Sequence, residues 1–276
     1  MIDQAQLPSG IATAIRIGID GINPILWAQL NGHIGGHLAS VYHVIGRRGE
    51  FVNSVAMQDI VEFNTASLIT IPEMAGTENL EIVSSSASDS AAGTGIRTLR
   101  VVYVDENGDQ QNSGLITLNG ITPVALSFKA KAIQWMEAYS VGSGGVSAGN
   151  ITLRNAATPT TIYEQISAGG NKSTSGRFMV PAKHYAILPS WDTHAVRQRV
   201  DFRIRATVHS IDGSESDGVY LFKDSAYIGA DQNGEHSLPW LVMPPLSKVK
   251  ISGIPDAISP QCRADTSFQV LMLRHS

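Results

Sequence analysis

Hydrophobic and polar residues alternate along most of the chain from residue 79 onward, and this pattern predicts β-strands. The clearest run is AVRQRVDFRIRATVHS (195–210), in which one set of alternate residues is apolar and the other is polar. Such alternation is typical of a strand with one buried face. The residues expected to face inward are Val196, Val200, Phe202, Ile204, Ala206 and Val208. A second alternating run, AIQWMEAYSV (132–141), predicts that Ile133, Trp135, Glu137 and Tyr139 share one face.

Turn signals separate these runs. Asn107-Gly108 lies between two strand-like segments and predicts a tight hairpin, because both residues tolerate positive φ. The return strand is expected at 114–118, before a second turn signal at Asn119-Gly120. About a dozen short strands at spacings of about 8–15 residues indicate an all-β fold, an antiparallel β-sandwich of the jelly-roll kind. No helical pattern of 10–15 residues lies between the strands, which disfavours a parallel α/β sheet.

Residues 1–75 differ from the rest of the chain. Segment 22–46 is apolar, contains four glycines and has no Lys, Arg, Asp or Glu. Its apolar residues follow no clean period, so we expect a partly irregular N-terminal arm or small subdomain over 1–75. The β-sandwich is then expected over 76–276, with a further division near 142–150 as an alternative. The Ser-rich stretch 84–95 is expected to be a long ordered loop.

Composition narrows the class of protein. Only 16% of the 276 residues are charged, against about 25% in a typical domain. Helices need charged residues on their outer faces, so this surface suits a β-rich protein. A net charge of −4 leaves no basic footprint for direct nucleic-acid binding. No apolar run approaches the length of a membrane span, and the N-terminus lacks a signal-peptide pattern.

Few residues suggest chemistry. His33 and His37 have the spacing of two ligands on a helix face, but the glycines around them argue against a helix. The acidic segment DENGD (105–109) lacks the remaining ligands of a calcium loop and is better explained by the hairpin. A single cysteine, Cys262, excludes an internal disulfide. We therefore expect no catalytic residue, no cofactor, no metal site and no enzymatic activity.

Two features point to a protein partner instead. An exposed segment 22–46 would form an apolar patch that needs a cover, with Trp27 and Tyr42 as its anchors. The polar face of 195–210 carries several arginines. This face is either an ordinary solvated strand face or a contact stripe for an acidic partner. The candidate interface residues are Trp27, Tyr42, Arg199, Arg203 and Arg205.

One stretch of the chain has a sequence pattern that resembles a known family. The segment TIPEMAGTENLEIVSSSASDSAAGTGIRTLRVVYVDENGDQQNSGLITLNGITPV (70–124) resembles a segment of virion structural proteins of tailed bacteriophages. The matching positions run from Leu80 to Ser86, include Asp89, Arg97 and Thr98, and close with 117–120, Pro123 and Val124. The likeness covers about a fifth of the chain. A vaguer one, over 240–253, is to the closing strands of a phage jelly roll.

This resemblance implies a non-enzymatic virion protein, and a capsid decoration or cement protein is the leading hypothesis. Its partners would be the major capsid protein or other virion proteins and further copies of itself, with a trimer favoured. It would lie on the outer capsid surface after assembly in the reducing bacterial cytoplasm, where disulfides are rare. Two alternatives stay open: a neck, tail or head-fibre component, or a receptor-recognition module that stacks sugars on exposed aromatics. The tryptophans considered for such stacking are Trp135, Trp191 and Trp240.

Overall fold

The computed structural model describes residues 40–52, 54–62, 70–207, 221–258 and 262–274. All regular elements in these ranges are β-strands, and every strand pairing is antiparallel. The all-β fold class is confirmed. The strands are β1 (Ser40–Arg48), β2 (Gln58–Asp59), β3 (Leu80–Ser84), β4 (Ile96–Val104), β5 (Gln110–Asn112), β6 (Ile116–Thr117), β7 (Val124–Ala125), β8 (Ala132–Val141), β9 (Ile151–Asn155), β10 (Ile162–Ile166), β11 (Arg177–Met179), β12 (His184–Val196), β13 (Val200–Ala206), β14 (Leu221–Ile228), β15 (Gln232–Met243), β16 (Lys248–Pro255) and β17 (Arg263–Arg274).

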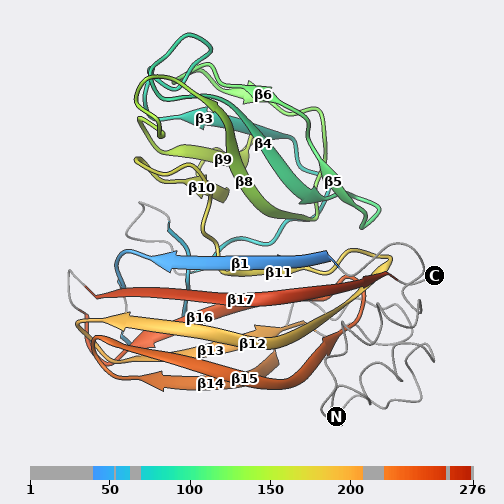
Figure 1. Cartoon of the computed structure of the whole chain (residues 1–276). Coiled ribbons are helices and arrows are strands. Elements are labelled where there is room, and N and C mark those ends of the chain that lie inside the picture. Colours follow the sequence, from blue (N-terminus) through green and yellow to red (C-terminus); the bar gives the residue numbers. More distant parts are fainter. Residues whose placement is uncertain (1–39, 53, 63–69, 208–220, 259–261, 275–276) are drawn as a thin grey trace.

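Eight of these strands form a jelly roll (Figure 1). Its two sheets have the strand orders β1-β17-β12-β15 and β11-β16-β13-β14. Counted among themselves in chain order, the eight strands lie as 1-8-3-6 and 2-7-4-5. This is the order of two interlocked Greek keys that defines a jelly roll. The short strand β2 extends the second sheet by pairing with β16.

The jelly roll has one apolar core between its sheets. On β13, the predicted inward residues Val200, Phe202, Ile204 and Ala206 are all fully buried, whereas Arg203 between them is exposed. The predicted alternation is confirmed over β13. The run 195–210 is not a single strand, however, because β12 ends at Val196 and a turn that includes Arg197, with a φ of +67°, precedes β13. Val208 lies outside the described residues. Trp191 of β12 is buried in the same core and donates its indole N–H to Asp224, 3.1 Å away.

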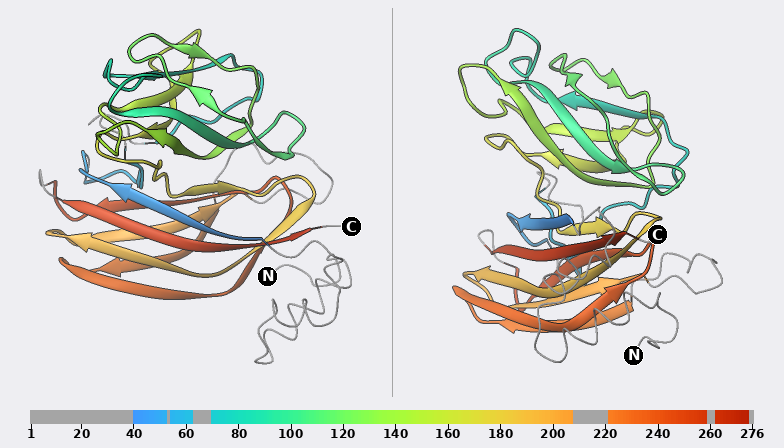
Figure 2. Two further views of the ribbon diagram at one scale, coloured as in Figure 1. Left: turned by 45° about the horizontal axis from the view of Figure 1, so that its top comes forward. Right: turned by 45° about the vertical axis from the view of Figure 1, so that its right-hand side comes forward.

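A second β-sandwich, the inserted sandwich (β3–β10), lies in the chain between β2 and β11. One of its sheets has the order β10-β9-β3-β7, and in the other β4 is flanked by β8 on one side and by β5 and β6 on the other. It has a separate apolar core. In Figure 2, both views show it as a distinct layer standing on the jelly roll.

The hairpin predicted at Asn107-Gly108 is present, and it connects β4 to β5. Gly108 has a φ of +86°, and Asp105 accepts hydrogen bonds from the backbone N–H groups of Asn107 and Asp109. The acidic segment 105–109 is thus a turn. The return is split in two, because β5 and β6 each pair with a different part of β4.

The division of the chain differs from the one expected from the sequence. Residues 40–62, assigned to an arm or subdomain, instead contribute β1 and β2 to the jelly roll. Phe51 and Ile60 are fully buried in its core, which explains why this stretch belongs there. Segment 142–150, the alternative division point, is the connection between β8 and β9 inside the inserted sandwich.

The Ser-rich stretch 84–95 is an ordered loop, as expected, and Asp89 organises it. The Asp89 carboxylate is fully buried and accepts hydrogen bonds from Ser84 Oγ and from the backbone N–H groups of Ile96, Ala148 and Gly149, all at 2.6–2.9 Å. These donors come from both ends of this loop and from the β8–β9 connection. One carboxylate therefore ties two crossing loops together.

Candidate functional site

Tyr42 lies at the junction between the two sandwiches, where its ring is half-buried. Its centroid is 5.5 Å from that of Trp135 in the inserted sandwich and 5.6 Å from that of Phe178 in β11. Its hydroxyl oxygen accepts a hydrogen bond of 2.8 Å from the side-chain amide of Gln110. The predicted anchor for an external partner is therefore an anchor between two parts of the same chain. Trp27, the other predicted anchor, lies outside the described residues.

Arg205 faces an internal network on the outer side of the second jelly-roll sheet. It donates to Ser252 Oγ at 2.6 Å and lies 3.5 Å from Asp59. The Asp59 carboxylate is buried and also accepts from Lys250 Nζ at 3.0 Å and from Ser252 Oγ at 2.9 Å. This network fixes β2 to β16, so Arg205 has a structural role that the sequence pattern did not indicate.

The other predicted arginines are exposed but engaged within the chain. Arg203 lies 2.8 Å from Asp201, its neighbour two positions back on β13. Arg199 precedes β13 and hydrogen-bonds the hydroxyl of Tyr227, which donates to Asp256 at 2.6 Å. The expected arginine stripe thus already has hydrogen-bonding partners within this chain. The structure favours the ordinary solvated face over a bare positive stripe.

The junction between the sandwiches is held by hydrogen bonds to backbone groups and by an ion pair. The buried Gln134 side chain donates to the carbonyl of Met179 at 2.6 Å and accepts from the N–H of the same residue at 3.0 Å. The N–H of Ala182 donates to the carbonyl of Gly108 at 2.7 Å, and Lys183 pairs with Asp109 at 2.9 Å. These contacts, at the last residue of β11 and in the connection that follows it, hold the inserted sandwich against the jelly roll.

A buried carboxylate lies where the chain returns from the inserted sandwich to the jelly roll. Glu164 of β10 is fully buried, accepts from Ser175 Oγ at 2.7 Å and lies 3.6 Å from Arg177. Burial raises the pKa of Glu164, although Arg177 and the hydrogen bond from Ser175 oppose that shift. Ser175 lies just before β11 and Arg177 is its first residue, so this cluster is part of the junction.

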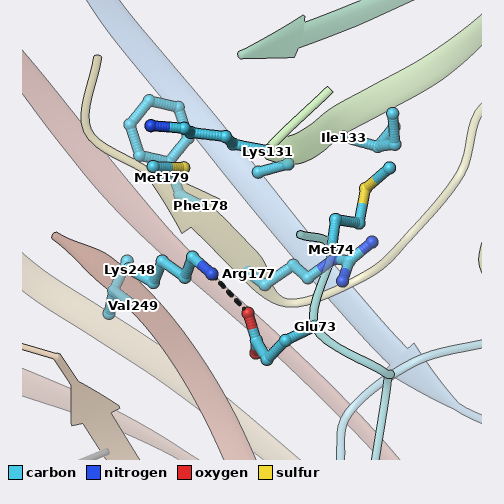
Figure 3. Close-up of a pocket in the computed structure, with 10 residues that line it drawn as sticks. Glu73, Met74, Lys131, Ile133, Arg177, Phe178, Met179, Lys248 and Val249 are labelled. Atoms are coloured by element: carbon cyan, nitrogen blue, oxygen red, sulfur yellow. Dashed lines mark hydrogen bonds and ion pairs between the residues drawn. The ribbon is translucent and has the colours of Figure 1, made fainter. Parts of the chain in front are cut away.

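The junction also contains a small pocket between the loop before β3, the start of β8 and strands β11 and β16 (Figure 3). Its volume of about 20 Å³ is room for a water molecule. Lys248 reaches across to Glu73 at 2.6 Å, so this ion pair also links the two sandwiches. A pocket of this size cannot hold a sugar or a nucleotide, which need several hundred Å³.

Other candidate chemistry finds little support. His33 and His37 lie outside the described residues, and within the described ranges no three His, Cys, Asp or Glu side chains gather as metal ligands. Burial raises the pKa of the Cys262 thiol to about 11, which keeps it protonated at neutral pH. Trp191 is buried, so it cannot stack on a sugar. The side chain of Trp240 lies outside what the structure describes. The described part of the chain contains no helix that could span a membrane.

The sequence pattern missed one outward face, which lies on β4 and β8 of the inserted sandwich. The run 132–141 was expected to place Ile133 and Tyr139 on the same side. In the structure Ile133 is buried in the core, whereas Tyr139 is 64% exposed. The pairing of β4 with β8 shifts register three times, and these shifts break the simple alternation. A strand of this length gives no sequence signal that locates a bulge.

No known protein family matches this sequence, and no curated protein matches it. Similar solved structures include infectious bursal disease virus, Gx strain, with 9% identity, a TM-score of 0.24, and coverage of 86% of this chain and 72% of that one. The tandem CBM22-1–CBM22-2 domain of Paenibacillus barcinonensis Xyn10C has 12% identity and a TM-score of 0.23, with 83% and 93% coverage. Likenesses at these TM-scores carry no argument for this chain, and its fold rests on its own strand order.

Proposed function

We propose that this chain is a non-enzymatic structural protein of a virion. The observation that carries the proposal is the architecture: a complete jelly roll with an intact second sandwich inserted between its first two strands and fixed to it. Jelly rolls occur in viral capsid domains, as well as in lectins and cupins. A rigidly held insertion suits a protein whose jelly roll contacts the particle while the second sandwich projects.

Two sequence features support this proposal. Segment 70–124, which resembles virion proteins of tailed bacteriophages, corresponds to the loop before β3 and to strands β3–β7 of the inserted sandwich. The low charge of the whole chain suits surfaces that become covered on assembly. The position we favour is the outer capsid surface, as a decoration or cement protein.

The proposed partners are the major capsid protein or another virion protein, together with further copies of this chain, in a trimer. Burial of surface at such contacts would stabilise the assembled shell by mass action. Assembly would take place in the cytoplasm of the bacterial host. A position in the neck, the tail or a head fibre is the alternative arrangement of the same structural role.

The test is rebinding. Particles that lack this protein are mixed with increasing amounts of the purified full chain, and bound protein is measured after sedimentation. We expect saturable binding to particles and none to free DNA. Failure to bind particles, with the chain shown to be folded by its β-type circular dichroism, would refute the proposal.

A further inference from the structure

Tyr139 occupies a bulge in the outward face of the inserted sandwich. In the pairing of β4 with β8, Thr98 lies opposite Ser140 and Leu99 lies opposite Ala138. This register leaves Tyr139 without a partner residue on β4. Bulges re-aim side chains and are frequent beside functional sites. Here the side chain concerned is an aromatic ring that is 64% exposed.

Polar groups surround this ring on the same sheet. Arg100 of β4 and Glu137 of β8 lie opposite each other and form an ion pair, and both remain partly exposed. The hydroxyl groups of Thr98 and Ser140 share a hydrogen bond of 2.6 Å. These groups bond one another in pairs, and each pair keeps further donor or acceptor positions for a ligand beside the exposed aromatic ring.

An apolar residue completes the face on the far side of Arg100. Ile116 of β6 lies opposite Leu99 and packs against the core, so the preceding Leu115 faces outward, where it is 56% exposed. Leu115 and Tyr139 are thus two exposed apolar side chains of the sheet that carries the ion pair. We refer to Thr98, Arg100, Leu115, Glu137, Tyr139 and Ser140 as the bulge face.

We propose that the bulge face binds an uncharged oligosaccharide. A sugar ring presents apolar C–H groups on one side and hydroxyls at its edge. The exposed ring of Tyr139 is a flat surface on which the C–H groups can stack. The Glu137 carboxylate and the Arg100 guanidinium are an acceptor and a donor for the hydroxyls.

The charges on this face leave little to bind an anion. Arg100 and Glu137 form an ion pair, and Lys172, whose backbone is bridged to that of Glu137, is exposed and directs its ammonium group toward the Trp135 ring, 5.3 Å from the ring centre. Only this one lysine would be left to pair with an anionic ligand, so we favour an uncharged one. A protein partner would need an extended face with an apolar centre. The bulge face contains an ion pair, which suits hydroxyls better than apolar side chains.

This inference goes beyond the structural role proposed above and does not depend on it, because the bulge face is complete within one chain. The purified full chain is tested on an array of neutral and sialylated oligosaccharides, and the affinity for each positive glycan is then measured by calorimetry. We expect saturable binding to at least one neutral glycan.

Variants locate the binding. Tyr139→Ala should weaken it at least about tenfold, and Glu137→Gln should weaken it while leaving the melting temperature close to that of the wild type. The matched control is Tyr227→Ala, since Tyr227 on β14 is 59% exposed but lies on the jelly roll. Its affinity should stay within about twofold of the wild type.

Three results would overturn the inference: no neutral glycan bound, binding confined to sialylated glycans, or a Tyr139→Ala variant that binds as the wild type does. Protection of 137–141 from hydrogen exchange in particles, without glycan binding, would assign this face to a protein contact instead. Rebinding of Tyr139→Ala to particles is measured separately, so loss of glycan binding and loss of the structural role are distinguishable.

Discussion

Asp89 shows how one residue can determine the order of two loops. Its carboxylate is fully buried and accepts hydrogen bonds from one hydroxyl and three backbone N–H groups, all of which are neutral donors. Three of those donors are backbone groups, so the arrangement does not depend on which side chains the loops carry. This explains why an aspartate occurs in the otherwise Ser-, Ala- and Gly-rich segment 84–95.

Replacing Asp89 with Asn puts an NH₂ group where an acceptor is required and removes the charge. We expect Asp89→Asn to lower the free energy of unfolding by about 2–4 kcal/mol, measured by urea denaturation. The matched control is Asp105→Asn, because Asn serves as well as Asp in a turn of this type. A loss for Asp89→Asn no larger than that of the control would contradict the role assigned to Asp89.

At the scale of elements, the sequence predicts those strands and turns that are determined by residues close together in the chain. The alternation of β13 and the turn at 105–109 depend on residues close together in the chain, and both are present in the structure. The place of β1 could not be predicted in this way. Its partner is β17, and the ion pair between Arg47 and Asp265 joins residues 218 positions apart. The glycines and mixed spacing around 22–46 concealed a strand whose register is set entirely by that distant partner.

The junction around β11 depends on Gln134, which acts like a strand neighbour of Met179. We expect Gln134→Ala to speed hydrogen exchange at Met179 and to destabilise the protein by about 1–3 kcal/mol, because both backbone groups lose their buried partner. Gln111→Ala is the control, since Gln111 is an exposed residue of β5 that contacts Asp105. Equal exchange at Met179 in both variants would show that Gln134 does not hold the junction.

Glu164 gives the junction a pH dependence. Because burial raises the pKa of Glu164 in the folded protein above its value of about 4.3 in the unfolded chain, the folded state binds the proton more tightly. The contribution of Glu164 to stability is therefore fully present below about pH 4 and is lost as the pH rises through the folded pKa.

Urea denaturation between pH 4 and 7 tests this effect. The free energy of unfolding of the wild type should fall relative to that of Glu164→Gln as the pH increases, since the amide does not titrate. A wild-type curve that rises relative to Glu164→Gln would contradict the buried, proton-retaining carboxylate.

At the scale of the molecule, the jelly roll closes only when its first strand, β1, pairs with its last strand, β17. β1 and β17 are neighbours in one sheet, and β2 is paired to β16. Residues 40–62 are thus part of the jelly roll, and the earlier expectation that 1–75 could act as an independent arm applies at most to 1–39.

Two truncations separate these parts. Removal of residues 1–39 leaves every described strand, so we expect a cooperative thermal transition and β-type circular dichroism. Removal of 1–62 deletes β1, β2 and the buried Phe51 and Ile60, and we expect this chain to aggregate or unfold. Cooperative unfolding of the shorter chain at the wild-type temperature would contradict the assignment of 40–62 to the jelly roll.

A structural component of a virus particle must be present in purified particles, so the abundance of this chain in virions is the decisive measurement. Quantitative mass spectrometry of gradient-purified virions, with isotope-labelled peptides of this chain and of the major capsid protein, gives the number of copies per particle. A virion protein should show a fixed stoichiometry, with hundreds of copies for a capsid decoration protein and a dozen or fewer for a neck or tail component. Absence of the chain from particles, while it is abundant in the infected cell, would refute the structural role.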